Sequence, residues 1–165
     1  MQAQAVATLI TDPRREDNPI VFVNEAAAAL TGYGAEEMLG RNCRLLIGAE
    51  TDPAALAKIR AAMAAEASLE IEIRLHRKDG AGCWNRVILA PLRVEAGVVA
   101  YFILNIIDIA VERDCVDALE EHNRVLTMMG EALARQNREL ARTCAALKHQ
   151  IEGTHAVAST PRSTH

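Results

Sequence analysis

The residues best suited to chemistry lie in one short stretch, Asn42-Cys43-Arg44. A cysteine thiolate is a strong nucleophile, and here the cysteine is held between a polar residue and an arginine. No histidine lies in this stretch, so it lacks the general base that activates a nucleophilic cysteine in ground-state catalysis. We interpret the stretch as part of a pocket. The alternative is an ordinary buried thiol, the usual role of a free cysteine.

The segments around this stretch are predicted to be short strands and helices. Two apolar runs joined by a polar, proline-containing connection predict a hairpin. Asn24 is a suitable N-cap for an alanine-rich helix that Gly32 ends, and Thr51-Asp52-Pro53 is a typical helix start. The predicted elements are strands 6–11 and 20–23 and helices 25–30, 35–39 and 54–65.

Three further strands are predicted after these helices. Residues 69–76 alternate between apolar and polar side chains, the period of a half-buried antiparallel strand. Lys78-Asp79-Gly80 forms a turn, and the strands at 84–89 and 100–106 follow with the same period. The order predicts an α+β domain with a five-stranded antiparallel sheet and short helices on one face.

A long helix is predicted after this domain. Leucine recurs every seven residues, and asparagine occupies two of the facing positions, a pattern typical of parallel dimeric coiled coils. The alternative is an amphipathic helix folded back on its own sheet. We therefore predict a sensory domain at 1–110, a dimerising helix at 111–152 and a disordered tail at 153–165. The leucines are Leu119, Leu126, Leu133, Leu140 and Leu147, and the asparagines are Asn123 and Asn137.

Composition excludes several functional classes. The net charge of -4 gives no reason to expect nucleic acid as a partner. Apolar runs are too short to span a membrane, and we expect a cytoplasmic protein. The four cysteines are widely spaced, which predicts neither a zinc site nor a redox dithiol.

With no recognisable kinase, cyclase or DNA-binding segment, we expect a protein that is not an enzyme and that acts through a homodimer or an unidentified effector protein.

Residues 6–112 resemble the light-oxygen-voltage (LOV) subgroup of PAS domains. The resemblance rests on a series of motifs that occur in the same order as in that family, which is more specific than any single motif. The motifs are Thr11-Asp12-Pro13, Asn18-Pro19-Ile20, Leu30-Thr31-Gly32-Tyr33, Gly40-Arg41-Asn42-Cys43-Arg44, Thr51-Asp52-Pro53 to Arg60, Arg77-Lys78-Asp79-Gly80, Trp84-Asn85 and Tyr101-Phe102.

The resemblance implies a pocket for flavin mononucleotide (FMN). Blue light would make the thiol of Cys43 add reversibly to the flavin, Asn42 would contact the ribityl chain, and Asn85 would contact the ring. Arg44 and Arg60 match the pair that binds the phosphate, for which arginine supplies charge-assisted, bidentate donors. The remaining pocket positions implied by the resemblance are Thr11, Ile47, Leu75, Leu89, Phe102, Leu104 and Ile106.

Five of the pocket positions depart from the family pattern. The family has polar amides where this chain has Ile47, Leu75 and Ile106, so three polar ring contacts are replaced by apolar side chains. Each unsatisfied polar group costs about 1–3 kcal/mol. Leu104 stands where the family usually has glycine, and Ala27 where it has phenylalanine. We therefore predict a more apolar pocket of altered shape.

Two functional hypotheses follow. The first is a blue-light sensory module with FMN, Cys43 as the adduct-forming thiol and a dimerising output helix. The second is a flavin-free, LOV-like PAS domain that mediates dimerisation or protein interaction, or senses an apolar ligand. An enzyme using Cys43 and a histidine is disfavoured, because His76 is predicted on the solvent face and His122 on the long helix.

Overall fold

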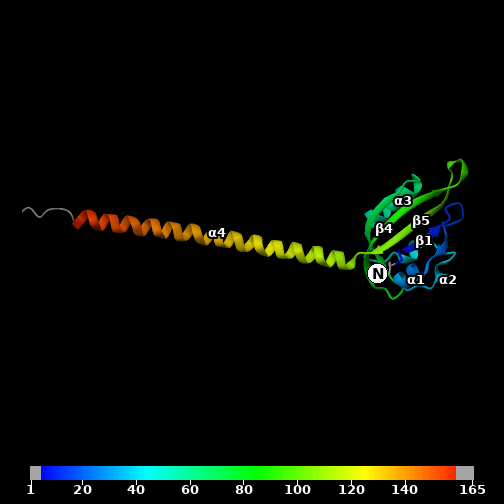
Figure 1. Cartoon of the computed structure of the whole chain (residues 1–165), viewed down its shortest axis with the longest axis horizontal. Helices are drawn as coiled ribbons and strands as arrows, with labels where there is room; N and C mark the ends of the chain where they lie inside the picture. Colours follow the sequence, from blue (N-terminus) through cyan, green and yellow to red (C-terminus); the bar gives the residue numbers. More distant parts are fainter. Residues whose placement is uncertain (1–4, 159–165) are drawn as a thin grey trace, which may run out of the picture. The chain divides into compact units, whose positions relative to one another are not determined.

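The computed structural model describes residues 5–158 and has the predicted α+β class. Five strands and three short α-helices precede one long helix (Figure 1). The elements are β1 (Ala7–Thr11), β2 (Ile20–Val23), α1 (Glu25–Thr31), α2 (Ala35–Met38), the 3₁₀ helix η1 (Cys43–Leu46), α3 (Pro53–Ala64), β3 (Leu69–His76), β4 (Gly82–Arg93), the 3₁₀ helix η2 (Glu95–Gly97), β5 (Val99–Asp108) and α4 (Ala110–Ala158).

The five strands form one antiparallel sheet in the order β2-β1-β5-β4-β3. β5 lies at the centre, so the first and last strands of the domain are neighbours. Leu104 on β5 pairs with Leu9 on β1 and with Leu89 on β4. Two residues further along β5, Ile106 pairs with Ala7 on β1 and with Val87 on β4. The prediction of a five-stranded antiparallel sheet is confirmed.

The core lies between one face of this sheet and the short helices. Alternating residues of the strands point into it, as the period-2 pattern predicted, and Ile73, Leu89 and Leu104 are all at most 6% exposed. The helices contribute small or flexible side chains, including Ala27, Met38 and Ala55. Because the chain has only two Phe, two Tyr and one Trp, close packing depends on aliphatic side chains.

The predicted caps fix the ends of α1 and α3. Asn24 Oδ1 accepts hydrogen bonds from Ala27 N at the start of α1 and from Thr8 N on β1, each at 2.9 Å. Gly32 ends α1 in the left-handed conformation with φ of 75°. Asp52 Oδ1 accepts from Ala54 N at 2.9 Å at the start of α3.

The last strand leads into α4 through a short, packed junction. Ile109 is 1% exposed, and its backbone N–H donates to the Trp84 carbonyl at 3.0 Å. The Arg113 guanidinium lies 4.2 Å from the centre of the Trp84 ring and 3.1 Å from the Glu72 carboxylate. The compact sheet unit therefore extends to Asp114, beyond the predicted boundary at residue 110.

Helix α4 continues through Ala158, which corrects the predicted end at residue 152. Gly153 does not end the helix, and Thr154 Oγ1 donates to the Gln150 carbonyl at 3.1 Å. The rest of the predicted disordered tail, residues 159–165, lies outside the described residues. None of the helices within residues 5–158 combines the length and apolarity needed to cross a membrane.

Candidate functional site

Cys43 is the first residue of η1, and its neighbour Asn42 caps that turn. Asn42 Oδ1 accepts from Arg44 N at 2.9 Å, and the Asn42 amide donates to the Asp17 carbonyl. The Arg44 guanidinium pairs with the Asp17 carboxylate, and both side chains are largely exposed. Asn42 and Arg44 therefore anchor η1 to the β1–β2 loop, and the Arg44 charge lies at the surface.

Cys43 lines a partly open cavity of about 60 Å³ at the margin of the core. Burial raises the pKa of its thiol, with a smaller opposing effect from nearby Arg44. The thiol is thus protonated at neutral pH. All the other lining residues are apolar: Leu9, Leu46, Ile47, Leu56, Ile59, Ile73, Leu75, Val87, Leu104 and Ile106.

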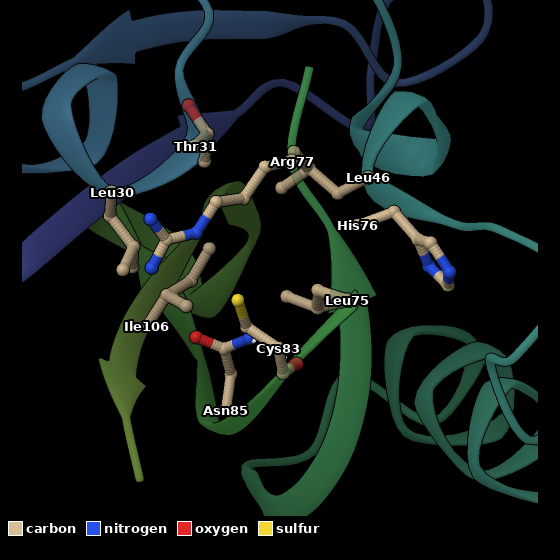
Figure 2. Close-up of a pocket in the computed structure, with 9 residues that line it drawn as sticks. All are labelled: Leu30, Thr31, Leu46, Leu75, His76, Arg77, Cys83, Asn85 and Ile106. Atoms are coloured by element: carbon tan, nitrogen blue, oxygen red, sulfur yellow. Dashed lines mark hydrogen bonds between the residues drawn. The ribbon is translucent and has the colours of Figure 1, made fainter. Parts of the chain in front are cut away.

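Asn85 lies at a second, smaller cavity of about 10 Å³ (Figure 2). Its side chain is almost fully buried, and its amide donates to the Cys83 carbonyl at 2.8 Å. Its carbonyl oxygen has no hydrogen-bond partner within the part of the chain that the structure describes. Arg77 also lines this cavity, and its buried Nε likewise has no hydrogen-bond partner among the described residues.

Three apolar side chains line both cavities: Leu46, Leu75 and Ile106. In Figure 2, Leu75 and Ile106 enter the smaller cavity from opposite sides, Leu75 from β3 and Ile106 from β5. Cys43 and Asn85, the two groups expected to meet one ligand, therefore lie at different cavities that have these three aliphatic residues in common.

The structure brings together only some of the predicted pocket residues. Cys43, Ile47, Leu75, Leu104 and Ile106 line the larger cavity, and Asn85 lines the smaller one with Leu75 and Ile106. The other predicted residues line neither cavity: Thr11, Leu89 and Phe102 are buried in the core, Asn42 is half-buried, and Arg44 and Arg60 are exposed. Their roles stay predictions.

His76 departs from the sequence prediction. Its side chain is only 14% exposed, although its place in β3 predicted the solvent face. The turn before α3 covers this strand edge, because Thr51 Oγ1 donates to the Arg74 carbonyl at 2.7 Å. A Cβ on Gly48 would lie 2.4 Å from the His76 ring, so only glycine permits this approach. The alternating pattern of a strand does not show whether a loop covers its outer face, so the burial of His76 could not be predicted from it.

No group of three or more metal-ligating side chains is found in residues 5–158. The lining of the larger cavity offers one polar group, the Cys43 thiol. The lining of this cavity is therefore suited to contact with an apolar molecule, or the cavity is simply a packing gap. Apart from the Cys43 thiol, it offers no group for acid–base catalysis.

Comparison with known proteins gives consistent results. A PAS domain family profile matches residues 6–110. The chain is 42% identical over 120 residues to a blue-light-activated histidine kinase of Brucella anthropi, covering 73% of this chain and 24% of that protein. A similar protein of Brucella ovis is 41% identical over the same length.

Solved structures agree with this comparison. The LOV domain of the Erythrobacter litoralis EL346 blue-light activated histidine kinase is 32% identical, with a TM-score of 0.62, covering 66% of this chain and 99% of that one. An RNA-binding light-oxygen-voltage receptor is 36% identical, with a TM-score of 0.68, covering 74% of this chain and 35% of that one.

Proposed function

This chain belongs to the LOV subgroup of the PAS domain family, and we propose that it is a sensory module that controls the pairing of its own C-terminal helix. The named relatives are activated by blue light, and the chain spans about a quarter of the length of the kinases it matches. In this proposal the sheet domain receives the stimulus and α4 carries the output.

The observation that carries this proposal is the packed junction between β5 and α4. Asp108 Oδ1 accepts from Ala110 N at 2.9 Å, and a single residue, Ile109, lies between the end of β5 and the start of α4. Ile109 is buried, and Arg113 in the first turn of α4 contacts Trp84 and Glu72. A change in sheet packing would therefore reach the first turn of α4 directly.

The output we propose is a homodimer through residues 111–152. The five heptad leucines are 52–58% exposed on the helix, an unusually large apolar surface for an isolated chain. Asn123 and Asn137 at the facing positions favour a parallel register. Gly130 opposes helix formation by about 1 kcal/mol, a cost that five leucine layers in a dimer would exceed.

Light scattering tests the dimer. The full chain should have the mass of a dimer, and a chain truncated after Asp114, where the compact sheet unit ends, should be monomeric. Leu126→Lys in the full chain should also give a monomer, whereas Arg124→Lys at a neighbouring surface position should not. A monomeric full chain, or an unchanged dimer after truncation, would contradict the proposal.

The rival hypothesis, against which the fit of the pocket argues below, is a blue-light receptor in which FMN is bound and Cys43 forms the adduct. The names of the relatives favour it, and so does a protonated thiol at a cavity wall. The protein would then be yellow as purified, would bleach in blue light and would recover in darkness. Cys43→Ala would retain the colour and lose the bleaching.

The residues present fit FMN only in part. Arg44 and Arg60 are exposed and accessible to a phosphate, although Arg44 is already paired with Asp17. The ring requires more space than the core provides. A cavity of about 150 Å³ holds a single benzene, whereas the cavity beside Cys43 measures about 60 Å³. A three-ring flavin does not fit this cavity, and we derive no photochemical step through it.

A further inference from the structure

We infer that Leu75, Leu104 and Ile106 exclude the flavin ring from this LOV domain, so that its sensory stimulus is not flavin photochemistry. This inference concerns the stimulus alone. It is independent of the proposed dimer, which has its own test.

The three side chains lie on the inner face of the sheet, Leu104 and Ile106 on the central strand β5 and Leu75 on the edge strand β3. Leu104 and Ile106 point inward from the central strand β5 and are 6% and 3% exposed. Leu75 projects from β3 into the same space and lines the cavity beside Cys43 together with the other two. Leu104 and Ile106 are therefore part of the packed core, Leu75 is partly buried against it, and all three side chains fill volume that a bound ring would need.

A planar ligand that contacted both Cys43 and Asn85 would have to reach both cavities. Leu75 and Ile106 line both of them, so these side chains would have to move aside. Protein interiors are packed as densely as organic crystals, so displaced side chains need a space to move into. The cavities of about 60 Å³ and 10 Å³ do not provide that space.

The polar chemistry of the site also argues against a ring. Apart from the thiol, the larger cavity has no hydrogen-bonding side chain in its lining, and the amide edge of a flavin would be left unsatisfied at about 1–3 kcal/mol for each group. The unpartnered Asn85 carbonyl does not require a flavin either. Its cavity of about 10 Å³ has room for one water at most.

Flavin binding to the full chain tests the inference directly. Purified protein should be colourless, and equilibrium dialysis against FMN should show no binding and no quenching of FMN fluorescence. Stoichiometric flavin in the purified protein, or saturable uptake of added FMN, would overturn the inference whatever the oligomeric state.

A triple variant tests whether these side chains are the cause. Leu75→Asn, Leu104→Gly and Ile106→Gln together remove volume and supply amides. They should give saturable FMN binding, with a dissociation constant at least about tenfold, which is 1.4 kcal/mol, below the highest FMN concentration at which the wild type shows no binding. Leu92→Gly, at an exposed position on β4, is the matched glycine control and should bind none. Circular dichroism establishes folding. A folded triple variant that binds no FMN would refute the assignment to these residues, and if it does not fold, the wild-type measurement still decides whether the ring is excluded.

Discussion

Cys43 and Asn85 lie at different cavities of the same core, and the side chains of Leu75 and Ile106 form part of the wall of both. The resemblance to LOV domains led us to expect the thiol and the amide around one ligand. In the structure, the thiol and the amide line separate cavities, and every other residue that lines the cavity beside the thiol is aliphatic. The interior beside the Cys43 thiol is therefore apolar, and the Arg44 and Arg60 side chains are exposed outside it.

Leu104→Ala should lower the free energy of unfolding by about 2–5 kcal/mol, because it enlarges a cavity in the middle of the core. Urea denaturation of the wild type and the variant measures the difference. Ile47→Ala is the matched control, since Ile47 lines the same cavity but is 36% exposed, and it should cost about 1 kcal/mol or less. Equal losses would mean that Leu104 is not tightly packed.

Cys43 should react slowly with iodoacetamide at neutral pH. The thiolate is the reactive form, and burial raises the pKa of this thiol, so less thiolate is present than at an exposed cysteine. Reaction at Cys43 should accelerate as the pH rises, while Cys115, which is exposed, reacts faster at every pH. Peptide mass spectrometry reports both sites in one sample. Faster labelling of Cys43 than Cys115 at neutral pH would contradict the raised pKa.

The sequence predicted elements well where the signal is local. Alternation in residues 69–76 located β3, and Gly32 correctly marked the end of α1. The division of the pocket was not predictable in this way. It depends on β3 and β5 bringing Leu75 and Ile106 to the lining of both cavities, and on side-chain volumes that no periodic pattern encodes.

Asn24→Ala should cost about 1–2 kcal/mol of stability, because one side chain both caps α1 and bonds Thr8 N on β1. Thermal or urea unfolding measures the loss. Asp52→Ala removes a single exposed cap bond at α3 and should cost less. If the two variants are equally destabilised, the bond to β1 contributes nothing.

Arg113→Ala should loosen the first turn of α4, because it removes the stacking on Trp84 and the ion pair with Glu72. Hydrogen exchange at residues 109–114 should accelerate by roughly five- to thirtyfold, the effect of about 1–2 kcal/mol of local stability. Arg124→Ala, which breaks a surface ion pair with Glu121 further along the helix, should leave that segment unchanged. If hydrogen exchange at residues 109–114 is unchanged in Arg113→Ala, the contacts of Arg113 do not couple the sheet to α4, and this part of the proposal is wrong.

Cys144 can report the register of the proposed dimer. It occupies the same heptad position as Asn123 and Asn137, so a parallel, in-register coiled coil places the two Cys144 side chains opposite each other at the interface. Diamide, which accepts the two electrons and two protons released by a pair of thiols, should then link the chains through a Cys144 disulfide, visible as a dimer on a non-reducing gel. Cys144→Ser should abolish this species and Cys115→Ser should not. A dimer by light scattering that gives no Cys144 cross-link would instead have its helices antiparallel or out of register, because facing cysteines must approach within about 7 Å between Cα atoms to form a disulfide.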